Sequence, residues 1–222
     1  MRLHHVQQNF LAWLENFDFP GFNLQLPDVI LWNGTPLHKL KAWHIWDSIR
    51  FKMPTVPWSK YVWHKLAITR YAHHQWVLCW DRLPTLQRLA SFGITVLQHC
   101  FLCVGGTEST AHLFVTCPYS SYVLRCLAEK LNLTFHATTW VDLLNEWGNS
   151  ADSARNQLAL LVLQVFSYHL WRERNARAHG KACFAPSKLF DGIVLDVKTK
   201  LSSSKWFLNI ACIDDFSYWS SI

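Results

Sequence analysis

Four potential metal ligands between residues 100 and 117 constrain this chain more than any other feature. Cys100 and Cys103 are separated by two residues, and a later pair completes the pattern C-x2-C-x8-H-x4-C with His112 and Cys117. Zn²⁺ prefers four tetrahedral ligands drawn from thiolate sulfur and imidazole nitrogen. Two cysteines at this spacing can hold a metal from one tight turn, and Gly105-Gly106 would let the backbone reverse before the second pair. The spacing predicts one zinc ion bound by these four side chains.

Other interpretations of the same residues remain open. The cysteines could be buried thiols beside an incidental histidine, and His99 is an alternative ligand because it adjoins Cys100. A redox-active C-x2-C pair would need a strand followed by a helix, which the surrounding sequence does not predict. If all four ligands come from the protein, the metal has no open position, so the site is predicted to be structural and not catalytic.

Composition limits the class of protein. Half of the 222 residues are hydrophobic and 13 are Trp, so a packed core is expected. The net charge of +6 permits binding to a polyanion without establishing it. Seven cysteines, three of them in one short segment, argue against a secreted disulfide framework and favour an intracellular, reducing compartment. The longest apolar stretch, residues 158–171, is too short and too polar to cross a bilayer, so no membrane association is expected. The remaining cysteines are expected to be buried thiols: Cys79, Cys126, Cys183 and Cys212.

The periodicity of apolar residues predicts a mainly α fold, a helical bundle with one short β-hairpin and a zinc-held CCHC loop. Asn33-Gly34 after a short strand at 28–32 is the hairpin signal. The zinc loop is expected at 94–118, and Pro118 suits the first turn of the helix that follows. His73-His74 is expected on a helix surface. Helices are predicted at residues 37–50, 68–83, 86–93, 118–131, 140–147, 154–178 and 188–201, and a short helix or turn is predicted at 58–66. The predicted divisions are a lead-in segment at 1–27, one domain at 28–201 and a tail at 202–222.

Several motifs accompany the ligands in a fixed order. They are Trp80-Asp-Arg-Leu-Pro-Thr85, then Arg88-Leu-Ala-Ser-Phe-Gly-Ile94, then His112-Leu-Phe-Val-Thr-Cys-Pro118, and finally Leu170-Trp-Arg-Glu-Arg-Asn-Ala-Arg-Ala-His179. Together they resemble the zinc-binding domain at the C-terminal end of plant LINE-type (non-LTR retrotransposon) reverse transcriptases. The resemblance covers about residues 28–200 and implies zinc at the same four ligands. Asp81 is a small departure, because the family commonly has Asn there.

The sequence does not predict a polymerase. A reverse transcriptase needs paired aspartates that hold two Mg²⁺ ions. The one adjacent pair, Asp214-Asp215, follows the zinc segment, whereas the resemblance places the polymerase before it. We therefore expect a non-catalytic accessory module, separated from its catalytic half, and not an enzyme.

RNA or DNA is the partner that the basic and aromatic residues favour, through backbone neutralisation and base stacking. Each candidate has a structural alternative: the arginines at 172–177 would also suit a helix C-terminus, and the tryptophans could be core residues. The candidate contacts are Arg82, Arg88, Arg172, Arg174, Arg177, Trp58 and Trp63. A competing hypothesis is a zinc-stabilised protein-interaction scaffold that contacts the polymerase portion of a retrotransposon protein. Nuclear residence is implied by the resemblance alone.

Overall fold

The computed structural model describes residues 29–97, 99–149, 153–181, 183–204 and 219. Within them the chain is mainly helical with one two-stranded hairpin, which confirms the predicted fold class. Contacts divide the chain into two units, residues 1–54 and 55–222, and each is described by itself. Cys212 and Asp214-Asp215 lie outside the described residues. Among the helices described, none combines the length and the apolar character needed to cross a membrane.

The first unit contains the predicted hairpin. Strand β1 (Leu31–Trp32) pairs antiparallel with β2 (Thr35–Pro36). Asn33 and Gly34 form the turn with φ angles of 47° and 77°, the left-handed conformation that a two-residue hairpin of this kind requires. The hairpin prediction is confirmed, although the strands are shorter than expected.

The helix predicted at 37–50 is interrupted. A 3-10 turn, η1 (Leu37–Lys39), precedes helix α2 (Ala42–Ile49). The break falls at Lys41, whose backbone N–H donates to the His44 ring nitrogen Nδ1 at 3.1 Å and so caps a new helix start. The indole of Trp32 donates to Ser48 Oγ at 2.9 Å, which joins the hairpin to α2.

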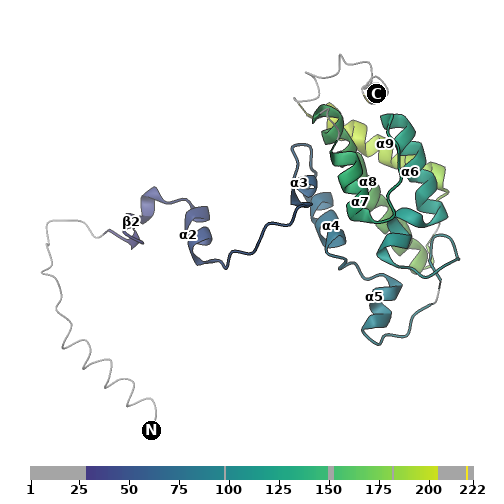
Figure 1. The fold of residues 1–222 in the computed structure, drawn as a ribbon, viewed down its shortest axis with the longest axis horizontal. Helices are drawn as coiled ribbons and strands as arrows, with labels where there is room; N and C mark the ends of the chain where they lie inside the picture. The colour runs from purple at the N-terminus through teal and green to yellow at the C-terminus, as the bar shows by residue number, and fades with distance from the viewer. Residues whose placement is uncertain (1–28, 98, 150–152, 182, 205–218, 220–222) are drawn as a thin grey trace, which may run out of the picture. The chain divides into compact units, whose positions relative to one another are not determined.

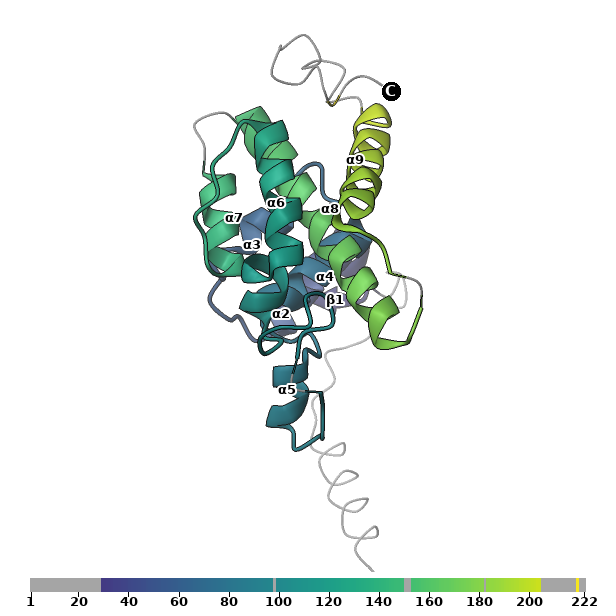
Figure 2. The same ribbon diagram turned by 90° about the vertical axis from the view of Figure 1, so that its right-hand side faces the viewer.

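The second unit is a bundle around its longest helix, α8 (Ser153–Ala178), as Figures 1 and 2 show. Residues 158–167 of α8 are buried on all sides, because neighbouring helices cover each face. The helices that contact α8 are α3 (Ser59–Val62), α4 (Thr69–Cys79), α6 (Pro118–Leu131), α7 (Trp140–Gly148) and α9 (Pro186–Ser202). Short helix α5 (Leu86–Ser91) and the Cys/His loop lie together at one end of this bundle (Figure 1).

Helix ends follow local chemistry. Pro118 occupies the first turn of α6, as predicted, because a missing N–H leaves nothing unpaired there. Helix α4 ends at Cys79 and not at residue 83. The reason is a left-handed residue, Asp81 (φ 51°), beside which Arg82 N–H donates to Val77 O at 3.0 Å. This geometry closes a helix and favours Gly or Asn, so the Asn common in the resembling family suits the position better than Asp.

Two expectations about single residues are wrong. His74 is buried, with its ring near the rings of Phe114 and Trp171, and burial lowers its pKa to about 4. Only His73 of that pair is exposed. Cys183 is exposed because it lies in the connection between α8 and α9, whereas Cys79 and Cys126 are half-buried.

Candidate metal centre

The four predicted ligands converge. The Sγ atoms of Cys100, Cys103 and Cys117 and a ring nitrogen of His112 all lie within 4.8 Å of one another. In a tetrahedron with zinc–sulfur bonds of about 2.3 Å, neighbouring sulfurs are about 3.8 Å apart. The cluster is therefore compact enough for a single ion. His99 is exposed and is not part of it.

The first ligand pair lies on a tight turn. Val104 N–H donates to Cys100 O at 2.9 Å, and Cys100 N–H donates to Gly106 O at 3.0 Å. Leu102 N–H points at the Cys100 sulfur, 3.4 Å away, where it can stabilise a thiolate. These bonds hold both sulfurs of the pair on the same side of the turn.

Two residues of this turn have left-handed backbone conformations, Val104 (φ 58°) and Gly106 (φ 70°). The expectation that Gly105-Gly106 together reverse the chain is therefore correct only for the second glycine. A Cβ at Gly106 would lie 3.3 Å from Cε1 of His112, so a side chain there would also press against the ligand ring. Val104 is different, because a β-branched residue in this region is strained.

We expect Val104→Gly to raise the free energy of unfolding of the metal-loaded chain by about 1 kcal/mol, because it releases left-handed strain. Urea denaturation would measure it. Gly106→Ala is the matched control at the other left-handed position and should destabilise the chain. A Val104→Gly variant less stable than the wild type would show that its side chain contributes more than its backbone strain removes.

The second ligand pair lies at the two ends of a π-helical turn, η2 (His112–Thr116). On an α-helix, residues five apart are about 140° from each other around the axis. The wider π turn, closed by Cys117 N–H donating to His112 O at 2.7 Å, brings them back to one side. The sequence predicts an irregular segment here, although the x4 spacing of the two ligands is a signal for a π turn.

The ionisation of two of the four ligands, His112 and Cys117, suits a metal. A hydrogen bond with Cys117, together with burial, raises the pKa of Cys100. The same bond lowers the pKa of Cys117, so one thiolate is favoured in the pair. Burial lowers the pKa of His112, which keeps the imidazole neutral at pH 7. Neutral imidazole and thiolate are the forms that bind a metal.

Glu108, between the two ligand pairs, is a site residue that the sequence analysis missed. It is fully buried, and its Oε1 atom accepts hydrogen bonds from Arg174 Nε at 3.0 Å and Nη2 at 2.6 Å. Oε1 also accepts from Leu86 N–H at the start of α5, at 3.1 Å. One carboxylate therefore joins the loop to α5 and α8. No sequence spacing indicates this contact, because its partners are 66 residues apart.

The predicted phosphate-binding ridge on α8 is wrong for Arg174 and is not supported for Arg177. Arg174 is buried between the rings of Phe101 and Trp171. Arg177 points inward to the first ligand pair, where Nη1 donates to Leu102 O at 2.9 Å. Arginines near a helix end are expected to be exposed, whereas the guanidinium groups of Arg174 and Arg177 hold the metal loop against α8. Arg172 is exposed and lies elsewhere on the helix.

The other candidate contacts separate into core and surface. Trp58 is buried, as its structural alternative allowed, and Trp63 is exposed. Arg82 is exposed with its guanidinium 5.5 Å from the ring centroid of Trp80. Arg88 is half-buried, donates to Asp81 O at 2.8 Å and lies over the ring of Phe92.

A closed set of three cysteines and one histidine, fixed by loop hydrogen bonds and a buried ion pair, defines a domain that could hold a structural metal ion. Residues 41–123 match the family model described as zinc-binding in reverse transcriptase. This segment, which includes all four ligands, is therefore similar to reverse-transcriptase zinc-binding domains. No curated protein and no solved structure matches the chain.

Proposed function

We propose that this chain is a non-catalytic accessory module of a retrotransposon reverse transcriptase, which holds one structural Zn²⁺ and binds the backbone of RNA or DNA. The plant LINE-type origin and the nuclear residence implied by the sequence resemblance form part of the proposal. In this proposal the metal ion would stabilise a loop, and the nucleic acid would bind beside that loop.

The ligand chemistry supports zinc. Three sulfurs and one imidazole nitrogen form a donor set typical of structural zinc sites and unsuited to Mg²⁺ or Ca²⁺, which prefer oxygen. Four protein ligands would leave no position for water or substrate. The ion would therefore stabilise the loop without acting on a substrate.

The observation that carries nucleic-acid binding is the corner between α4 and α5, next to the metal loop. Two exposed aromatic rings flank α5: Trp80 lies at the corner before it and Phe92 directly after it, and each has an arginine over it. Arg82 lies over the first at 5.5 Å and Arg88 over the second at 5.2 Å. Exposed rings can stack on bases while adjacent guanidinium groups neutralise phosphates, as in proteins that bind single strands without sequence preference.

Salt-dependent binding tests this proposal. We expect the metal-loaded chain to bind single-stranded RNA and DNA with an affinity that falls linearly on a log–log plot against salt concentration. Arg82→Gln should reduce the slope by about 0.7, the value for one lost contact to a single-strand phosphate. Arg125→Gln, which removes an exposed arginine on α6, is the matched control and should leave the slope unchanged.

A wild-type chain that binds neither nucleic acid at low salt would contradict the proposal and favour the protein-interaction scaffold. One feature of the first unit supports that second candidate. Helix α2 has no buried residue within the described chain, and its apolar side chains recur every third position at Trp43, Trp46 and Ile49. Such a stripe suits contact with another protein surface, such as the polymerase portion.

A further inference from the structure

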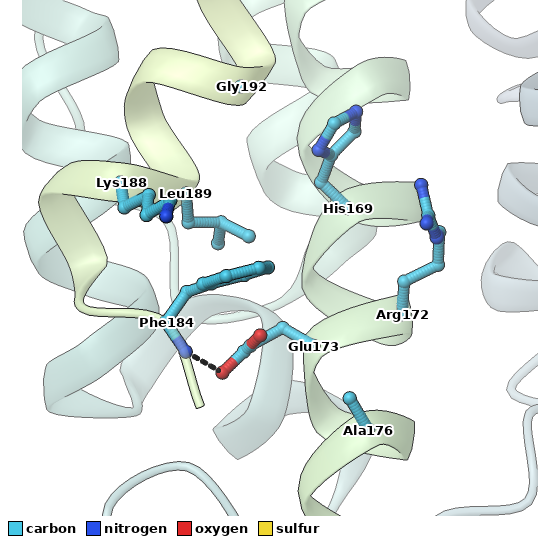
Figure 3. Close-up of a pocket in the computed structure, with 8 residues that line it drawn as sticks. All are labelled: His169, Arg172, Glu173, Ala176, Phe184, Lys188, Leu189 and Gly192. Carbon is cyan, nitrogen blue, oxygen red and sulfur yellow. Dashed lines mark hydrogen bonds between the residues drawn. The ribbon is translucent and has the colours of Figure 1, made fainter. Parts of the chain in front are cut away.

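A pocket of about 300 Å³ lies between α8 and α9, separate from the metal ligands. Helix α8 contributes His169, Arg172 and Glu173, and α9 contributes Lys188 and Gly192. Figure 3 shows the ring of Phe184, from the connection between these helices, projecting between them. The volume is at the lower end of the range for ligand sites, which suits one small ring system.

Hydrogen bonds hold the backbone of Phe184 in place. Its N–H donates to Glu173 Oε1 at 2.9 Å (Figure 3), and its carbonyl oxygen accepts from Arg177 Nη2 at 2.9 Å and from Tyr119 OH at 3.0 Å. Both backbone polar groups of this loop residue are therefore fixed, yet 45% of the residue is exposed. An aromatic residue whose backbone is already fixed, and whose ring is open to solvent, can stack on a base without the cost of ordering its backbone.

The side chains that line the pocket carry more positive than negative charge, and Asp196, outside the lining, lies close enough to Arg172 for that cation to lower its pKa. Arg172 and Lys188 are exposed cations in its lining, and the Lys188 ammonium lies 4.9 Å from the Phe184 ring centroid. Helix α9 has no acidic residue in its first turn, so its positive dipole end adds to this charge. The one carboxylate in the lining, Glu173, is neutralised by Arg177 Nε at 2.8 Å.

The other polar side chain in the lining, the imidazole of His169, already has a hydrogen-bond partner. His169 Nε2 lies 2.8 Å from Asp196 Oδ2, which also accepts from Tyr71 OH at 2.8 Å. Across from the imidazole, Gly192 leaves space that a Cβ would fill, in van der Waals contact with the ring at 3.6 Å. The lining thus combines the aromatic ring of Phe184, the open space beside Gly192 and two cations, Arg172 and Lys188.

We propose that this pocket binds one nucleotide of a single-stranded nucleic acid, with the base against Phe184 and the phosphate at Lys188. The proposal rests on the nucleic-acid function proposed above and adds a second contact point, on α8 and α9. An acidic peptide would satisfy the cations but would leave the fixed aromatic face without a planar partner.

The test uses the full, metal-loaded chain and a labelled oligouridylate of about 12 nucleotides, within the usual size of a single-strand site. Fluorescence anisotropy would compare the wild type with Phe184→Leu and Lys188→Gln. Each should bind roughly tenfold more weakly, the loss that corresponds to one stacked base or one close charge pair. Phe51→Leu and Lys181→Gln remove an exposed ring and an exposed charge that do not line the pocket, and both should bind as the wild type does.

Uridine monophosphate and inorganic phosphate separate a nucleotide site from a simple anion site. Uridine monophosphate should shift the Gly192 amide signal in NMR spectra to saturation, and this response should be lost in Phe184→Leu. Inorganic phosphate that binds as tightly, with no effect of Phe184→Leu, would overturn the proposal.

Two further outcomes show whether the pocket proposal fails alone or together with the proposed nucleic-acid function. If oligouridylate binding is weakened by Arg82→Gln but not by Phe184→Leu or Lys188→Gln, the pocket proposal fails and the proposed function stands. If the wild type does not bind oligouridylate at all, both fail.

Discussion

Chelation of the metal is expected to unfold at least residues 94–131 of the zinc-loaded chain. The loop has little regular secondary structure, and its ligands hold two left-handed residues and a π turn that the chain would not otherwise favour. Cys117 also directly precedes α6, so loss of the metal should release the start of that helix. Apparent binding free energies for structural zinc reach about 10–16 kcal/mol in isolated fingers, more than the stability of most domains.

Circular dichroism and thermal melting with and without chelator would measure this effect. Cys117→Ser should reproduce the unfolding in the presence of zinc. Cys126→Ser is the matched control, since it changes a half-buried cysteine on α6 that is outside the cluster. Unchanged helical signal and melting temperature after complete removal of the metal would refute a structural role for the site.

Glu108→Ala is expected to destabilise the chain by about 3–5 kcal/mol, because it leaves the Arg174 charge buried without its partner. The variant also removes the acceptor for Leu86 N–H, so α5 should loosen from the loop. Chemical denaturation of the metal-loaded protein would measure the loss. Glu129→Ala, which removes an exposed carboxylate on α6, should change the free energy of unfolding by no more than about 0.5 kcal/mol.

A double variant separates the effect of losing the Glu108–Arg174 ion pair from the effect of losing the volume of its side chains. Glu108→Leu combined with Arg174→Met replaces both charges by apolar side chains and should recover much of the lost stability. If Glu108→Ala proves as mild as Glu129→Ala, the carboxylate would not be the anchor that its four N–H donors indicate.

The sequence predicted the parts of this chain in which local chemistry limits the choice. Zinc accepts few residue types at few spacings, so the four ligands could be identified from the pattern. The Asn33 and Gly34 turn and the start of α6 at Pro118 follow from backbone conformations that few residues adopt. These features depend on neighbours within a few residues.

The sequence failed where the partner is distant. Nothing near Arg174 shows that its guanidinium meets Glu108, so a charge near a helix end was expected to face solvent. His74 was placed on a surface because helical periodicity does not reveal which faces other helices cover. The same difficulty applies to α8, which is covered on several sides and therefore has no clear polar face over residues 158–167.

Arg174 and Arg177, which point inward from α8, also help to define which part of the chain folds as an independent unit. The family match ends at residue 123, yet Glu108 depends on a guanidinium 66 residues away and Leu102 O on one 75 residues away. The recognisable segment thus lacks the counter-charge of its own buried acid. In evolutionary exchange, the zinc loop and the last turns of α8 would have to be inherited together, because either part alone would retain a buried charge without a partner.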